Sequence, residues 1–138
     1  MEGRLKGRVA VITGGARGIG KATARKMLGE GASVAILDMA EAVSRTAEEL
    51  QAAGGKVLGL RVDVTRKDEV FKSIDEVLTR FGRADILVNN AGLVRPALLE
   101  DVQEKDWDDV VNVNLKGTFF ATRAVLPSMK KNRFGKIV

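Results

Sequence analysis

A group of glycines is the feature of this sequence that points most directly to chemistry. Gly14 follows an apolar run at residues 8–13, and Gly18 and Gly20 open the helical pattern that begins at Gly18. Glycine lets a backbone adopt positive φ and come close to a ligand. The first turn of the helix would direct its amide groups and the positive end of its dipole at the loop, which suits a phosphate. A tight turn without a ligand is the alternative, but the order strand, glycines, helix favours phosphate binding.

The spacing of the glycines and one acidic residue further along the chain distinguish a dinucleotide site from a nucleoside-triphosphate site. Lys21 follows Gly20 as in a nucleoside-triphosphate loop, but Ala22 stands where that loop needs Ser or Thr. Asp38 ends the next apolar run, about 20 residues further on, where a carboxylate can accept hydrogen bonds from the ribose of a dinucleotide. A cap for the following helix is the alternative role of Asp38. These features favour a dinucleotide site over a kinase or ATPase.

Three absent residue types limit the catalysis that the chain can perform. Its 138 residues include no Cys, no His and no Tyr. Thiolate nucleophiles, zinc–cysteine sites and the usual acid or base at neutral pH are therefore excluded. Catalysis by this chain must use Asp, Glu, Lys, Arg, Ser, Thr or backbone groups, and we expect no metal site.

Strand and helix patterns alternate along the whole chain. Strands are predicted at residues 8–13, 33–38, 56–64 and 84–88, and a short one at 136–138. Helices are predicted at 18–30, 40–53, about 66–81 and about 103–131, the last with a bend near Gly117 and Pro127. Ile19, Thr23 and Met27 share one face of the first helix, and Thr65 is the expected N-cap of the third.

This alternation predicts the fold class. Nearly continuous apolar strands are typical of a sheet that is covered on both faces. Strands that alternate with helices imply right-handed crossovers and parallel pairing. Residues 1–138 are therefore expected to form a single α/β domain with a doubly wound parallel sheet.

Several motifs in order resemble those of the short-chain dehydrogenase/reductase family, including its 3-oxoacyl-acyl-carrier-protein reductases. Besides the loop from Thr13 to Gly20, Asp63-Val64 resembles the adenine-contacting pair, Asn89-Asn-Ala-Gly92 the NNAG motif, and Asn114 the helix asparagine of the catalytic tetrad. The resemblance implies a Rossmann-like sheet in the order 3-2-1-4-5 with the fifth strand cut short. It implies cofactor contacts from Gly14, Gly15, Ala16, Arg17, Gly18, Ile19, Gly20, Asp38, Asp63, Val64, Asn90, Ala91 and Gly92.

The same resemblance implies reversible hydride transfer between a nicotinamide cofactor and a small carbonyl or alcohol substrate. Asn114 would be a catalytic residue that positions a water. The serine and the Tyr-x-x-x-Lys pair of the family have no counterpart in a chain without Tyr. We therefore expect the amino-terminal part of a longer enzyme, inactive by itself. The alternative is a binding half-domain that holds the adenosine end of the cofactor without turnover.

Two residues favour different cofactors. Asp38 favours NAD, because a carboxylate would repel the 2′-phosphate of NADP. Arg17 is a residue that relatives preferring NADP carry, so NADP stays an alternative. A flexible, solvated arginine gains less from a phosphate than a facing carboxylate costs, and we expect NAD.

Charge and hydrophobic pattern bear on location and partners. The net charge is +5, but Lys and Arg are scattered and aromatic residues are few, so we expect no nucleic-acid partner. Neither a membrane span nor a signal peptide is apparent, which makes the cytoplasm the expected location. A short fifth strand would leave the edge of the fourth strand (85–89) unpaired. Trp107, Phe119 and Phe120 are expected in the core or at a subunit contact, so we expect a homo-oligomer.

Overall fold

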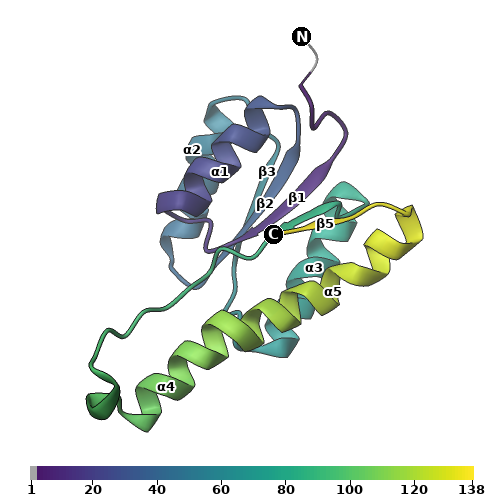
Figure 1. Ribbon diagram of the computed structural model, residues 1–138. Helices are drawn as coiled ribbons and strands as arrows, with labels where there is room; N and C mark the ends of the chain where they lie inside the picture. The colour runs from purple at the N-terminus through teal and green to yellow at the C-terminus, as the bar shows by residue number, and fades with distance from the viewer. Residues whose placement is uncertain (1–2) are drawn as a thin grey trace.

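The computed structural model describes residues 3–138 (Figure 1). The first half contains β1 (Val9–Thr13), α1 (Gly18–Gly29), β2 (Ser33–Asp38), α2 (Ala42–Ala52), β3 (Val57–Arg61) and α3 (Lys67–Phe81). The second half contains β4 (Ile86–Val88), the 3₁₀ turn η1 (Leu99–Asp101), α4 (Glu104–Val111), the π-helical segment η2 (Asn112–Lys116), α5 (Gly117–Asn132) and β5 (Lys136–Ile137).

The five strands form one parallel sheet in the order β3-β2-β1-β4-β5, which confirms the predicted topology. The pairing of β1 with β2 runs from Val9↔Ser33 to Thr13↔Leu37. Because all strands are parallel, their carboxyl ends meet at one edge of the sheet. The segments that follow β1, β2, β3 and β4 are therefore brought together there.

Helices cover both faces of the sheet, as Figure 1 shows: α1 and α2 lie on one face, and α3 and α5 on the other. Successive residues of β1 face opposite ways. Val9 and Val11 belong to the core under α3 and α5, and Ala10 and Ile12 to the core under α1 and α2. All five residues of β1 are buried, as a central strand covered on both faces requires.

The fully buried residues of α1 are among its smallest ones. Gly20 and Ala24 are the buried residues of this helix, whereas Ile19 is 79% exposed. A Cβ on Gly20 would lie 2.2 Å from the carbonyl oxygen of Gly14, so a larger residue has no room there. Of the three residues whose spacing predicted this helix, Met27 packs against the core under α1 and α2, and Ile19 faces away from it.

The start of α3 differs from the prediction. The helix begins at Lys67 with Arg66 at the N-cap position, and no side chain caps it within the described residues. The hydroxyl of Thr65 instead donates to Asp63 Oδ1 at 2.7 Å. Thr65 is therefore part of the turn after β3 and does not cap the helix.

The predicted long helix near residues 103–131 is present and is interrupted by a π-helical segment. It runs from Glu104 through η2 to Asn132 and continues through Pro127. Where α5 begins, a Cβ on Gly117 would lie 2.8 Å from a methyl group of Val64. The absence of a side chain at Gly117 therefore lets the helix approach the segment after β3.

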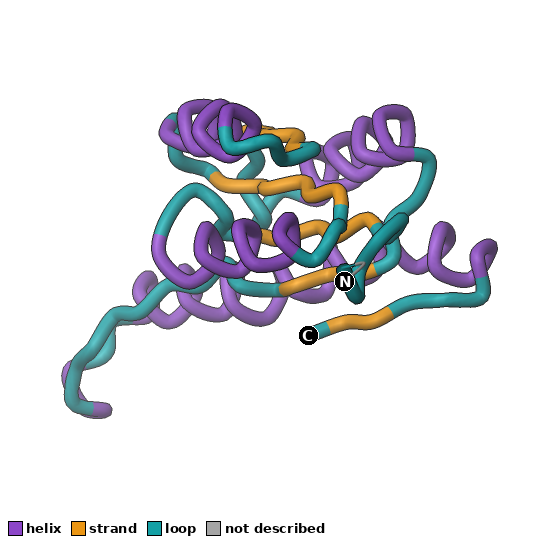
Figure 2. The backbone as a smooth tube through the Cα atoms, turned by 90° about the horizontal axis from the view of Figure 1, so that it is seen from above, coloured by secondary structure: helices purple, strands orange, loops and turns teal. Residues whose placement is uncertain are grey.

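Aromatic residues on this long helix have two different environments. Phe120 is buried in the core, whereas Trp107 is 61% and Phe119 54% exposed. Figure 2 shows the loop before η1 extending away from the body of the domain. Trp107 and Phe119 therefore stay largely uncovered by the rest of residues 3–138.

The edge of β4 is covered, contrary to the prediction. The amides of Lys136 and Val138 donate to Asp85 O and Leu87 O, both at 2.9 Å, and the amide of Asn89 donates to Val138 O at 2.8 Å. The short last strand therefore pairs with β4 at Ile86↔Lys136 and Leu87↔Ile137, and the bond between Asn89 and Val138 extends this pairing past the end of β4. The open edge belongs to β5, which lies at the outer edge of the sheet in Figure 2.

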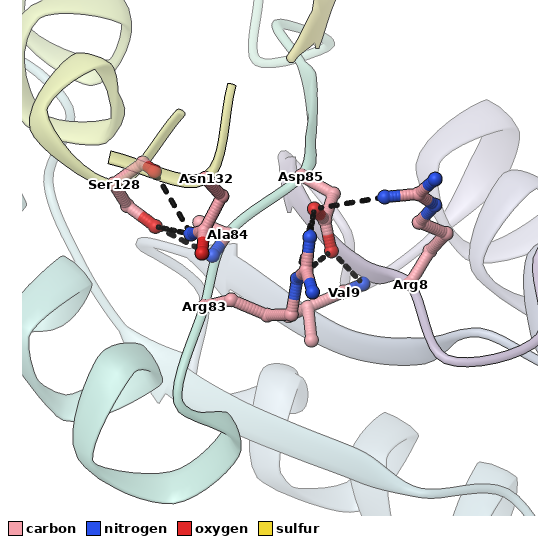
Figure 3. A network of polar contacts seen from close by, with 7 residues as sticks. All are labelled: Arg8, Val9, Arg83, Ala84, Asp85, Ser128 and Asn132. Carbon is pink, nitrogen blue, oxygen red and sulfur yellow. Dashed lines mark hydrogen bonds and ion pairs between the residues drawn. The ribbon is translucent and has the colours of Figure 1, made fainter. Parts of the chain in front are cut away.

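A buried carboxylate lies at the amino ends of β1 and β4 (Figure 3). Asp85 accepts the Val9 amide at 2.9 Å and the guanidinium of Arg83 at 2.6–2.9 Å, and Arg8 lies 3.5 Å away. Arg8 also stacks over the ring of Phe134, 3.7 Å from its centroid. This network joins the starts of two strands to the turn before β5.

Candidate functional site

A cleft of about 500 Å³ opens at the carboxyl ends of the strands. Most of the residues predicted to contact a cofactor line it: Gly14, Arg17, Ile19, Asp38, Asp63, Val64, Asn90, Ala91 and Gly92. Gly15, Ala16, Gly18 and Gly20 lie in the same loop without lining the cleft; all but the exposed Gly18 are buried. The fold therefore gathers segments that are far apart in sequence around one opening.

The glycine loop has the geometry of an anion site. Gly14 and Gly18 have positive φ, 66° and 55°, and a Cβ on Gly18 would point into open space. No side chain among the described residues caps α1, although the first amides of a helix lack partners within it. These amides and the helix dipole are thus available to a phosphate, and the loop fits the pyrophosphate of a dinucleotide.

Lys21 does not reach toward this loop. Its ammonium donates a hydrogen bond to Glu49 of α2, and this bond lowers the pKa of Glu49 below its ordinary value. The contact joins the first turn of α1 to α2. The lysine is thus used between helices, in agreement with the absence of a nucleoside-triphosphate loop.

Asp38 joins two segments that border the cleft. Its Oδ2 accepts the amide of Ala16 at 3.0 Å and its Oδ1 accepts the amide of Ala40 at 2.9 Å. Helix α2 begins at Ala42 with Glu41 at the N-cap position, so Asp38 is not the cap of that helix. The carboxylate fixes the glycine loop and lines the cleft, where a ribose hydroxyl could reach it.

Asp63 and Val64 form the wall of the cleft beyond β3. Asp63 Oδ1 accepts the amide and the hydroxyl of Thr65, at 2.9 and 2.7 Å. The amide of Asp63 donates to Glu69 at 2.9 Å. These bonds hold the turn in place, and Val64 packs against Gly117 from the long helix.

Asn90 connects the segment after β4 to the glycine loop. Its side-chain amide donates to the carbonyl oxygens of Thr13 and Gly14, at 3.1 and 3.0 Å. The Thr13 hydroxyl in turn accepts the amides of Asn90 and Ala91. Asn90 therefore satisfies buried backbone groups while it lines the cleft. The side-chain oxygen of the neighbouring Asn89 is buried without a hydrogen-bond partner in the described chain.

Asn114 lies in the π-helical segment and does not line the cleft directly. Its Oδ1 accepts the Leu93 amide at 2.8 Å and its Nδ2 donates to the Leu93 carbonyl at 2.9 Å. The hydroxyl of Thr118 donates to the backbone carbonyl of Asn114 at 2.8 Å. The Asn114 side chain thus fixes the position of Leu93, which does line the cleft.

Six residues that line the cleft were not predicted as cofactor contacts: Leu37, Met39, Val62, Leu93, Arg95 and Val113. Thr13 was recognised as the start of the glycine loop, but its bonds to the segment after β4 were not predicted. Thr13 joins the ends of β1 and β4, and Arg95 lines the cleft beyond Leu93. A polar residue that ends a buried strand could have signalled these bonds of Thr13. Arg95 is the first basic residue after the NNAG motif, which could have signalled a charged wall.

Residues 3–138 hold neither a membrane-spanning helix nor a cluster of metal ligands. None of the helices in this range combines the length and apolar character needed to cross a bilayer. Nor do three or more acidic side chains in it gather as a metal ion would require.

Comparisons with known proteins agree with the fold and the motifs. A family model described as short chain dehydrogenase matches residues 8–138. The (2S)-[(R)-hydroxy(phenyl)methyl]succinyl-CoA dehydrogenase subunit BbsD of Thauera aromatica is 47% identical over 97% of this chain and 54% of its own length. The 3-oxoacyl-[acyl-carrier-protein] reductase FabG of Thermotoga maritima is 46% identical over 98% of this chain and 55% of its own length.

A solved structure gives the same result in three dimensions. NAD⁺-bound xylitol dehydrogenase superposes with a TM-score of 0.93 and 32% identity, over 97% of this chain and 52% of that one. The chain therefore spans about half the length of the relatives that it matches. From the sheet order, the glycine loop and the match over residues 8–138, we conclude that this chain belongs to the short-chain dehydrogenase family of oxidoreductases.

Proposed function

We propose that this chain is the dinucleotide-binding part of an enzyme that transfers hydride between a nicotinamide cofactor and a carbonyl or alcohol. The observation that carries the proposal is the uncapped amino end of α1 beside the glycine loop, in the same cleft as Asp38. An anion site next to a carboxylate suits a pyrophosphate joined to a ribose. The chain's membership of an oxidoreductase family supports the reaction class.

Each part of the cleft has a proposed role. Residues 14–20 hold the pyrophosphate, and Asp38 accepts the ribose hydroxyls. Asp63 and Val64 border the adenine, and residues 90–92 border the nicotinamide half. A bound nicotinamide would supply the hydride donor or acceptor. Asn114 fixes the wall at Leu93 and positions a water for proton transfer, the role proposed for it as a catalytic residue.

NAD is the proposed cofactor, with NADP as the alternative. Asp38 would face the 2′-phosphate of NADP, and like charges at close range are unfavourable. Arg61, which pairs with Asp38 across β2 and β3, donates to the Met39 carbonyl at 3.0 Å and to Glu41 at 3.2 Å. This arginine is therefore occupied, and the exposed Arg17 is the basic residue of the glycine loop that could meet a phosphate.

The substrate is proposed from the similar proteins, and the assembly from the exposed aromatic residues of this chain. Similarity to a 3-oxoacyl-[acyl-carrier-protein] reductase and to BbsD supports a 3-oxoacyl thioester or another small ketone or alcohol as substrate. The exposed Trp107 and Phe119 support a homo-oligomer. We propose a cytoplasmic enzyme without a nucleic-acid or membrane partner. The second candidate is a binding half-domain without turnover, favoured by the absence of Tyr.

Calorimetric titration with NADH and NADPH tests the cofactor. We expect NADH to bind about 10-fold or more tightly than NADPH, the size of effect that a facing carboxylate produces. The double variant Asp38→Ser, Met39→Arg should shift the preference toward NADPH. Tighter binding of NADPH by the parent chain would contradict the weight given to Asp38. No binding of either cofactor would refute the proposed function.

A further inference from the structure

The cleft has a charged group on the side away from Asp38 and Asp63. In the sheet order β3-β2-β1-β4, the segments after β2 and β3 lie on one side of β1, and the segment after β4 lies on the other. Arg95 lines the cleft from that other side, beyond Gly92 and Leu93. The adenosine half of a dinucleotide is assigned to the acidic side, so Arg95 lies where the substrate would enter.

The backbone that carries Arg95 is held in place, while its charge stays accessible. Asn114 binds both backbone groups of Leu93, two residues earlier, and Pro96 restricts the backbone just after Arg95. The Arg95 side chain is 47% exposed; its guanidinium donates to Val94 O at 3.4 Å and lies 3.7 Å from the carboxylate of Asp106 in α4. An exposed ion pair of this length is weak, so the guanidinium is available to another anion.

The chemistry of Arg95 selects the kind of group that it would bind. A guanidinium presents five N–H donors in a fork that matches two oxygens of a carboxylate. We propose that Arg95 is a specificity-determining residue that binds a carboxylate near the reacting carbonyl. Among the proposed substrates the enzyme then prefers small ketones that are oxo acids to neutral esters, including a 3-oxoacyl thioester without a carboxylate. This assignment rests on the proposed function, because it places the substrate beyond residues 90–92 of the cofactor cleft.

Binding of two matched ligands tests the assignment without turnover. Acetoacetate and methyl acetoacetate carry the same 3-oxo carbonyl and differ in the carboxylate. We expect acetoacetate to bind the chain about 10-fold more tightly, as measured by NMR titration with and without saturating NAD⁺. Arg95→Gln should remove this difference by weakening acetoacetate alone. Arg80→Gln, at the exposed end of α3, is the matched control and should change neither ligand.

A second variant has the opposite expected effect. Asp106→Asn removes the carboxylate that competes for Arg95, so acetoacetate should bind about 2-fold more tightly. A merely structural role for the pair would not give opposite effects in Arg95→Gln and Asp106→Asn.

Several results would overturn the assignment. These are equal affinity for the two ligands in the parent chain, equal losses in Arg95→Gln and Arg80→Gln, and inorganic phosphate binding as tightly as acetoacetate. A failure of NAD⁺ to bind would refute the proposed function instead. The comparison between the parent chain and Arg95→Gln would still be read from the titrations without cofactor.

Discussion

The amino ends and the carboxyl ends of the parallel strands form two opposite edges of the sheet, and these two edges use polar side chains in opposite ways. At the amino ends, Asp85 is 0% exposed, and its carboxylate is occupied by the Val9 amide and two arginines (Figure 3). At the carboxyl ends, Asp38 also binds backbone amides, but it borders a cleft, and the amides that begin α1 have no side-chain cap. One carboxylate is enclosed within the protein, and the other can still meet a ligand.

The different access of Asp85 and Asp38 to a ligand distinguishes a structural carboxylate from one that can bind a ligand. Both residues end up bonded to the backbone of another strand or loop, so a hydrogen-bond count does not distinguish them. What distinguishes them is access: a buried carboxylate must be saturated by protein groups, because an unpaired buried charge is costly. A carboxylate at a cleft can keep part of its bonding capacity for a ligand.

The largest expected effect tests whether the cleft by itself is sufficient for catalysis. We predict that a chain of these 138 residues has no dehydrogenase activity, because it lacks the tyrosine acid of the family, and loss of acid catalysis costs about 10²–10⁴-fold or more. NADH oxidation is measured with a small ketone and with a 3-oxoacyl thioester, on protein of verified mass. Turnover at ordinary enzyme rates would contradict the prediction and show that the cleft at the carboxyl ends of the strands contains all the groups needed for catalysis.

The next effect tests the amino-end edge. Asp85→Ala leaves the buried Val9 amide without its acceptor, and an unsatisfied buried donor costs about 1–3 kcal/mol of stability. The side chains of Arg8 and Arg83, in contrast, are 35% and 33% exposed and can be hydrated. Urea unfolding followed by circular dichroism measures this change. Asp75→Ala, on the exposed side of α3, is the matched control and should stay within about 0.5 kcal/mol. A small effect of Asp85→Ala would remove the contrast between the two edges.

A substitution in the glycine loop sharpens the comparison from the cleft side. In Gly20→Ala, the new methyl group would lie 2.2 Å from Gly14 O and 2.6 Å from Asn90 Nδ2, so the loop must shift. Overpacking of this kind costs about 1–3 kcal/mol, and NADH should bind about 10-fold more weakly. Gly29→Ala lies in the same helix with no atom within 4 Å and should leave NADH binding unchanged. Equal effects on binding would argue against a role of the loop.

The smallest expected effect is the pH dependence at the amino-end edge. The Arg4 amide and then its side chain donate to Glu30 and lower its pKa below the ordinary value of 4.5. A carboxyl with a lowered folded-state pKa stabilises the fold above the unfolded value, and this stabilisation is lost as the pH falls. Glu30→Gln should therefore reduce the loss of stability between about pH 5 and pH 3.

Arg4→Gln offers a comparison within the same contact. It keeps the backbone amide, the larger cause of the shift, and should reduce the pH dependence less than Glu30→Gln does. Urea midpoints across the pH range check both variants. An unchanged pH profile in Glu30→Gln would show that other carboxylates account for the acid sensitivity.

The sequence predicted more about elements than about contacts. Alternating apolar patterns predicted a parallel sheet with helices on both faces, and the glycine spacing placed the loop correctly. The strand order came from the resemblance to the short-chain dehydrogenase/reductase family. The wrong predictions concern partners: Thr65 does not cap α3, and the edge of β4 is paired. Local pattern could not settle these points, because each depends on which hydrogen-bond partner the folded chain brings within reach.

What the sequence determined by itself is the set of residues that could make a nucleotide site, and their assignment to strand ends. Apolar periodicity and glycine conformational freedom are local properties, so they can be recognised without a structure. Only the tertiary structure decided that Asp38 binds the Ala16 amide, that Asn114 holds Leu93, and that Arg95 borders the cleft. Parallel pairing brings these segments to one edge of the sheet, and their distances depend on that packing.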